Sequence, residues 1–121
     1  MPRVVHFEVS ADDLDRAQKF YGDVFGWSFR EWNGGEYILV KTGEDSEPGI
    51  NGGIFKRPEP MTGHINTISV PSLDEYTEKV TSNGGTLMMP KMAIPEVGWL
   101  AYFKDSEGSM FGLMEFDPNA A

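Results

Sequence analysis

The sequence contains no cysteine, and this absence removes a class of chemistry before any motif is considered. Without cysteine there is no disulfide, no thiolate nucleophile and no thiolate metal ligand. No apolar run is long enough for a transmembrane helix, and the first residues lack the pattern of a secretory signal. We therefore expect a cytoplasmic protein that does not enter a membrane.

Positive charge is also scarce. The chain has 10 Lys and Arg against 19 Asp and Glu, which gives a net charge of −9. Because nucleic acids and anionic membranes are bound through clustered Lys and Arg, this balance argues against both as partners. An acidic surface favours cationic ligands, but it equally serves ordinary solubility, which is the simpler interpretation.

What the chain does have is a repeat, in which a strand, a helix and three further strands occur twice. Asp12 is the expected N-cap of the first helix, and Gly26 its expected end. Ser72 begins a capping box with Glu75 at the start of the second helix. The predicted elements are strands 4–10, 27–32, 36–41, 50–55, 64–70, 86–92, 99–104 and 110–116, with helices 13–25 and from 72 to about 82.

A linker is predicted over residues 56–63, because Pro58 and Pro60 interrupt any regular element there. It divides the chain into a first module of about residues 1–57 and a second of about 62–117. The length of 121 residues fits one domain that contains both modules.

Three short motifs carry a resemblance to a known superfamily. They are Asp13-Leu14 with Phe20-Tyr21 and Phe25-Gly26-Trp27, then Asn83-Gly84-Gly85, and Tyr102-Phe103-Lys104-Asp105-Ser106-Glu107-Gly108, where Ser106 replaces a usual proline. They are similar to signatures of the vicinal oxygen chelate superfamily, which includes glyoxalase I, bleomycin-resistance proteins and extradiol dioxygenases. The chain most resembles the small glyoxalase-like members.

This resemblance implies an α+β fold. Two tandem βαβββ modules would form curled mixed sheets around a shared cleft, with the helices on the outer face. In metal-dependent members, four side chains point into that cleft from the first and last strand of each module, and they are commonly His and Glu. The resemblance also implies a homodimer, and it leaves open whether the cleft forms within one chain or across the dimer.

The first strand of each module holds one metal-ligand position, and only the position in the first module carries a suitable residue. His6 has the expected spacing, and its alternation with Val5 and Phe7 places it toward the cleft. The matching position in the second module is Ile65, which cannot bind metal. His64 is next to it with the opposite parity, so it reaches the cleft only through a bulge, and the sequence leaves this open.

In the last strand of each module, the usual glutamate positions fall on glycine. They are Gly112 in the second module and Gly52 or Gly53 in the first, whereas Glu115 has the opposite parity to Gly112. Since a catalytic zinc needs three protein ligands, His6 alone, or with Glu8, does not predict a tight metal site. We expect no cofactor.

The leading hypothesis is a small-molecule-binding protein of this superfamily without the usual metal centre, with a small organic molecule as partner. One alternative is a glyoxalase-like lyase or isomerase that acts by proton transfer, with His6 or Glu8 as base and a weakly held divalent metal. Another is a structural dimer module with a vestigial cleft. The residues expected to line the ligand cleft are His6, Glu8, Ile54, Ile65, Thr67, Trp99 and Met114.

Overall fold

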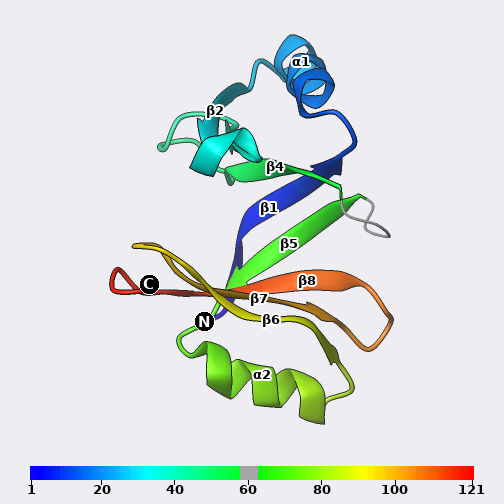
Figure 1. Ribbon diagram of the computed structural model, residues 1–121, viewed down its shortest axis with the longest axis vertical. Coiled ribbons are helices and arrows are strands. Elements are labelled where there is room, and N and C mark those ends of the chain that lie inside the picture. The colour runs from blue at the N-terminus through cyan, green and yellow to red at the C-terminus, as the bar shows by residue number, and fades with distance from the viewer. Residues whose placement is uncertain (58–62) are drawn as a thin grey trace. The chain divides into compact units, whose positions relative to one another are not determined.

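The computed structural model describes residues 1–57 and 63–121, which divide into two compact units (Figure 1). The N-terminal unit is residues 6–64, and the C-terminal unit is residues 65–121 together with residues 1–5. The prolines at 58 and 60, on which the predicted linker depends, lie outside the described residues. Within the described residues, no helix is both long enough and apolar enough to span a bilayer.

The N-terminal unit contains one helix and four strands. In chain order they are β1 Arg3–Ala11, α1 Leu14–Phe25, β2 Ser28–Trp32, the 3-10 helix η1 Asn33–Gly35, β3 Tyr37–Lys41 and β4 Gly52–Lys56. The strands lie in the order β2-β3-β4-β1, with β1 parallel to β4 and the other neighbours antiparallel. The predicted hairpin turn at 33–35 is a 3-10 turn, in which Gly34 and Gly35 have φ values of 84° and 86° that favour glycine.

Helix α1 and its N-cap each begin one residue later than predicted. The side chain of Asp13, not Asp12, accepts a hydrogen bond from the backbone N–H of Arg16 at 3.0 Å. The predicted N-cap was therefore wrong, because the carboxylate of Asp12 instead pairs with Arg57. The predicted end was confirmed, since Gly26 closes the helix in a left-handed conformation with φ of 73°.

The helix covers one face of the N-terminal sheet, and the core of the unit lies between them (Figure 1). Alternate residues of each strand point toward α1, as period-two alternation requires. Partly buried side chains of α1, including Leu14, Ala17 and Tyr21, pack on them. The buried strand residues of this core are Val9, Ala11, Ile38, Val40 and Ile54.

The C-terminal unit repeats the pattern. Its elements are β5 His64–Ser69, α2 Leu73–Ser82, β6 Thr86–Ile94, β7 Gly98–Lys104 and β8 Met110–Phe116. The strands lie in the order β5-β8-β7-β6, with β5 parallel to β8. The prediction of an α+β fold built from two βαβββ modules is confirmed.

Helix α2 is anchored at its start by two side chains. Ser72 Oγ accepts a hydrogen bond from the backbone N–H of Glu75 at 3.2 Å, which confirms Ser72 as N-cap. The backbone N–H of Leu73 donates to Glu115 Oε1 at 2.8 Å. Glu115 thus faces α2, as its strand parity predicted, and its negative charge suits the positive end of the helix dipole. The buried residues of the core beneath α2 are Val70, Leu73, Ala101, Phe103 and Leu113.

Candidate functional site

The face of the N-terminal sheet that points away from α1 carries polar side chains from β1. His6 and Glu8 alternate with Phe7 and Val9, which pack toward the helix. Glu8 is buried, with 4% of its surface exposed, whereas His6 is only partly buried. A buried carboxylate needs hydrogen-bond partners, so the residues around Glu8 determine what this face can do.

Tyr37, the first residue of β3, joins these two side chains. Its hydroxyl lies 2.7 Å from His6 Nε2. The same hydroxyl donates a hydrogen bond to Glu8 Oε2, also at 2.7 Å. The phenol therefore stands between the imidazole and the carboxylate, and the three side chains form one hydrogen-bonded row.

Gly53 provides the space for this phenol. It is the cross-strand partner of Glu8 on β1 and of Leu39 on β3. Tyr37 lies two residues from Leu39 on the same strand face, so its ring reaches diagonally across Gly53. A Cβ atom at Gly53 would overlap the Tyr37 hydroxyl and ring. The ring of Tyr37 can therefore occupy this position only because residue 53 is glycine.

The imidazole of His6 is held in its neutral form by its surroundings. Burial lowers the pKa of His6, because the charged form loses its hydration, and the negative charge of Glu8 only partly opposes this effect. His6 is consequently uncharged at neutral pH, with one ring nitrogen protonated and the other carrying a lone pair.

These residues do not fit the metal ion that the superfamily resemblance implies. His6 and Glu8 are the two metal-binding side chains on this face, and both are hydrogen-bonded to Tyr37. Gly53 supplies no donor. Throughout residues 1–57 and 63–121, no three His, Asp or Glu side chains gather as an ion would require. A phenol thus occupies the place between the donors where a bound ion would have to lie.

The C-terminal unit shows a related arrangement on the face that points away from α2. Ile65 and Thr67 of β5 lie on it with 4% and 3% exposure, and Met114 of β8 lies there partly buried. Gly112 is the cross-strand partner of both Thr67 and Tyr102. A Cβ at Gly112 would lie 3.2 Å from Thr67 Oγ1 and 3.3 Å from Tyr102 Cε1. Each unit therefore places a glycine of its last strand beside a tyrosine of the neighbouring strand.

Two of the residues expected to line a ligand cleft lie on the opposite, helix-covered faces. Ile54 pairs with Val9 and is buried beneath α1 with 1% exposure. Trp99 packs toward the core beneath α2, and its Nε1–H donates to Asp117 Oδ2 at 3.1 Å. Neither residue therefore belongs in the wall of the expected cleft, because strand alternation turns each one toward the helix of its own unit.

His64 and Tyr37 complete the comparison with the sequence predictions. His64 is exposed at the start of β5 and alternates with Ile65, so it does not share that residue's face. Tyr37 was not predicted. One signal could have found it, because Ile38 and Val40 of the same strand point to the helix and so place Tyr37 on the polar face, near the glycine pair of β4.

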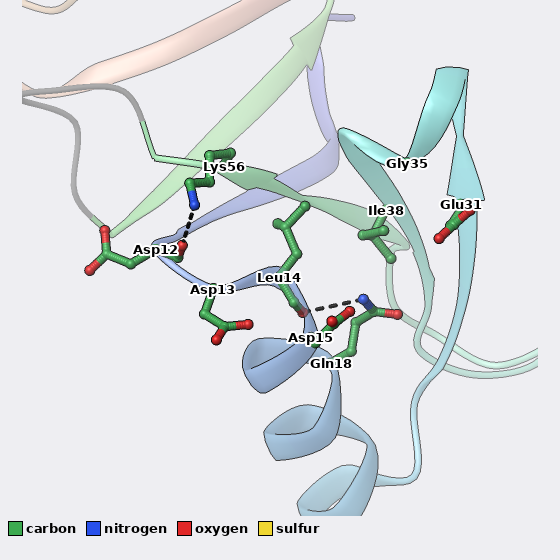
Figure 2. Close-up of a pocket in the computed structure, with 9 residues that line it drawn as sticks. All are labelled: Asp12, Asp13, Leu14, Asp15, Gln18, Glu31, Gly35, Ile38 and Lys56. Carbon is green, nitrogen blue, oxygen red and sulfur yellow. Dashed lines mark hydrogen bonds between the residues drawn. The ribbon is translucent and has the colours of Figure 1, made fainter.

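A separate acidic pocket of about 350 Å³ lies at the start of α1 (Figure 2). The residues that line it include Asp12, Asp13, Asp15 and Glu31, together with Lys56. The backbone N–H of Arg16 lowers the pKa of Asp13, in keeping with its role as helix cap. Acidic side chains in the first turn of a helix are ordinary, because they complement the helix dipole.

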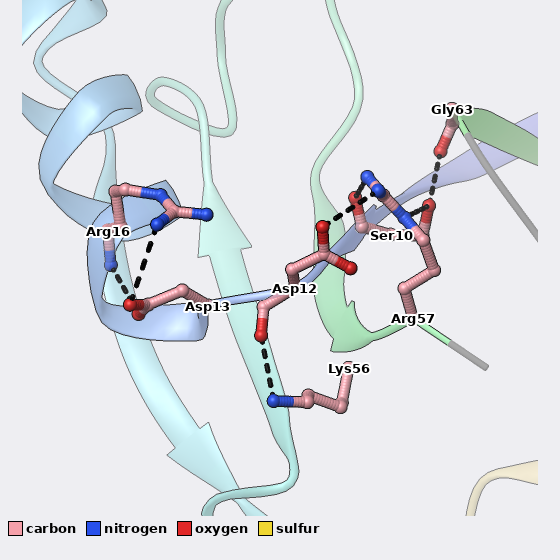
Figure 3. A network of polar contacts seen from close by, with 7 residues as sticks. All are labelled: Ser10, Asp12, Asp13, Arg16, Lys56, Arg57 and Gly63. Atoms are coloured by element: carbon pink, nitrogen blue, oxygen red, sulfur yellow. Dashed lines mark hydrogen bonds and ion pairs between the residues drawn. The ribbon is translucent and has the colours of Figure 1, made fainter. Parts of the chain in front are cut away.

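Arg57 and Gly63 are each hydrogen-bonded to Ser10, near the end of β1 (Figure 3). Arg57 donates to the backbone oxygen of Ser10 at 3.1 Å and to Asp12 Oδ2 at 3.2 Å. Gly63 O accepts from the backbone N–H of Ser10 at 3.1 Å and from its Oγ at 3.2 Å. The end of β1 is thereby fixed, which positions the strand that carries His6 and Glu8.

Comparison with known sequences links the chain to proteins with related names. A family described as bleomycin resistance protein-like N-terminal matches residues 3–43. A glyoxylase-like domain-containing protein of Didymella fabae is 33% identical over 108 residues, which cover 84% of each chain. A second relative is CFP32 of Mycobacterium bovis, which is described as a glyoxylase. It is 29% identical over 113 residues, which cover 89% of this chain. The chain spans 43% of the length of CFP32.

Solved structures share the fold at lower identity. A variant of methylmalonyl-CoA epimerase from Streptomyces coelicolor, in complex with 2-nitronate-propionyl-CoA, matches with a TM-score of 0.70. The match covers 98% of this chain and 97% of that protein, with 14% sequence identity. At this identity the likeness concerns the fold alone.

Proposed function

The chain belongs to the glyoxylase-like family of the vicinal oxygen chelate superfamily, and on that premise we propose that it binds a small organic molecule without the usual metal ion. The observation that carries the proposal is the position of Tyr37, whose hydroxyl is hydrogen-bonded to both His6 and Glu8. The face then offers a ligand a neutral imidazole and a phenol. Ile65, Thr67 and Met114 lie on the corresponding face of the C-terminal unit, and we propose that this face also contacts small organic molecules.

Binding is tested with a thermal-shift panel of small aromatic compounds and cationic antibiotics. A ligand present at 100 times its Kd stabilises the folded protein by about 2.7 kcal/mol, which a melting scan resolves. We expect at least one compound to raise the melting temperature, and His6→Ala to reduce that rise. His64→Ala is the matched control, because His64 is an exposed histidine. Silence across the panel, or shifts that His6→Ala leaves intact, would contradict the proposal and favour a purely structural module.

A second candidate function is proton transfer next to a carbonyl group, as in a lyase or isomerase. The hydrogen-bonded row of His6, Tyr37 and Glu8 favours it, because such rows move protons between their members. The test is exchange of α-protons of small carbonyl compounds with deuterated water, followed by NMR. Enzymatic exchange that Glu8→Gln abolishes would support this function, and exchange that is equal in the variant would exclude Glu8 from it.

We also propose a homodimer in the cytoplasm, in keeping with the superfamily resemblance. Sedimentation velocity measures the first property, and the expected result is a species of about twice the 13.5 kDa chain mass. A single species at the monomer mass across micromolar concentrations would contradict the dimer. Cell fractionation tests the compartment.

A further inference from the structure

We infer that Tyr37 couples His6 to the buried carboxylate of Glu8, so that a proton taken from a ligand at His6 is finally held by Glu8. The inference rests on the proposed use of this face for ligand binding. It adds the chemical class of the ligand, which is one that offers a proton or a hydrogen-bond donor. It also gives Tyr37 a role as a proton relay between His6 and Glu8, which the sequence did not predict.

The direction of the two hydrogen bonds fixes the state of the imidazole. A phenol has one proton to donate, and Tyr37 donates it to Glu8 Oε2. The contact between Tyr37 and His6 at 2.7 Å must then have Nε2–H as the donor. Because a neutral imidazole carries one N–H, Nδ1 of His6 bears the lone pair. The face therefore presents a hydrogen-bond acceptor at His6.

The same row can move a proton inward without leaving a charge on the imidazole. A ligand proton would bond to Nδ1 as the Nε2 proton passes to the Tyr37 oxygen and the phenol proton passes to Glu8 Oε2. The ligand becomes an anion, Glu8 becomes a neutral acid, and His6 ends neutral with its proton on Nδ1. Burial lowers the pKa of His6, so a route that avoids the imidazolium form is favoured.

The difference in solvent exposure between His6 and Glu8 determines the direction in which a proton moves along the row. His6 is partly exposed, whereas Glu8 has only 4% of its surface in contact with solvent. A ligand can reach the imidazole more readily than the carboxylate. The expected ligands are accordingly compounds with an N–H or O–H donor, or with a carbon acid beside a carbonyl group.

The coupling is tested by NMR of protein labelled with ¹⁵N in its histidine rings. The chain has two histidines, so the spectrum holds two imidazoles, and the exposed His64 serves as an internal reference. At pH 8, above the ordinary histidine pKa, the ¹⁵N shifts of the His6 ring report which of its nitrogens is protonated. We expect His6 to be protonated at Nε2 in the natural protein. Predominant protonation at Nδ1 would overturn the inference.

Two variants show whether the coupling passes through Tyr37. In Glu8→Leu the phenol proton is released from the carboxylate and can bond to Nε2, so His6 should switch to the Nδ1-protonated form. In Tyr37→Phe, which keeps the ring, His6 should become a mixture of both forms. In the double variant, Glu8→Leu should add nothing. A His6 spectrum that ignores Glu8, or one that responds equally without Tyr37, would overturn the inference.

The outcome is independent of the binding panel. If no compound in the panel binds, the proposed function fails and the tautomer of His6 still reports on the coupling. If compounds bind while His6 behaves as the exposed His64 does, the proposed function stands and the coupling is refuted. The Tyr37→Phe variant is nearly isosteric, so it keeps the test available if Glu8→Leu does not fold.

Discussion

Replacing Gly53 with alanine tests whether the position of the Tyr37 ring depends on glycine at residue 53. The new Cβ would overlap the phenol of Tyr37, so the ring must leave its place beside Glu8. Overpacking of this kind costs about 1–3 kcal/mol. A buried Glu8 that loses the hydrogen bond from the phenol costs a further ~1–3 kcal/mol. Alanine also restricts the unfolded chain, which stabilises the folded protein by about 0.4–1 kcal/mol at a position that alanine can adopt. Gly53 is such a position, because its φ is not positive.

The net expectation is a loss of about 2–4 kcal/mol in the free energy of unfolding, measured by urea titration. With a urea dependence of roughly 1–3 kcal/mol per molar, the midpoint should fall by roughly 2 M. Gly112→Ala is the matched control, since its Cβ would meet Thr67 Oγ1 at 3.2 Å and Tyr102 Cε1 at 3.3 Å. Small adjustments relieve contacts of that length, so the control should lose less than about 1 kcal/mol.

A double-mutant cycle makes the test specific to the phenol. In a Tyr37→Ala background the ring is absent, so Gly53→Ala should cost little, and the coupling energy between the two sites should reach about 2 kcal/mol. A Gly53→Ala variant as stable as the natural protein would refute the reasoning. So would equal losses from Gly53→Ala with and without Tyr37.

Three further predictions concern charge, capping and packing. The pKa of folded His6 lies below its ordinary value of 6.5, so the unfolded chain binds more protons as pH falls through that range. Stability should therefore drop below about pH 6.5, and His6→Gln should flatten the drop. Ser72→Ala should remove the N-cap of α2 and cost about 1 kcal/mol in urea unfolding, and Ser72→Thr should retain most of it. Ile54→Ala should cost about 2–5 kcal/mol because Ile54 is fully buried, yet it should leave ligand affinity unchanged, as measured by calorimetry on the folded protein.

The repeated strand and helix pattern was predictable because its signals are local. The alternation along β1, the cap at Ser72 and the left-handed glycine at 26 each depend on a few neighbouring residues. The same alternation placed His6 and Glu8 on one face, and the structure agrees. The N-cap of α1 was misplaced by one residue because two adjacent aspartates offered equivalent caps, and a distant arginine decided between them.

The position of Tyr37 depends on contacts that the sequence does not reveal. Its role requires the register of β3 against β4 and of β4 against β1, which place residue 37 diagonally across Gly53 and Gly53 beside Glu8. Without that register, the sequence does not show which of Gly52 and Gly53 lies beside Glu8. The prediction assigned Ile54 and Trp99 to the wrong face for the same reason, since a shift of one residue reverses every side chain on a strand.

Metal content is the most direct measurement of whether a phenol stands in place of the ion. The protein is purified without chelator, and its Ni, Zn, Mn and Fe content is determined by elemental analysis before and after incubation with each divalent ion. We expect no ion in stoichiometric amount, because His6 and Glu8 are both bonded to Tyr37. One ion per chain, lost in His6→Ala and retained in His64→Ala, would contradict the account.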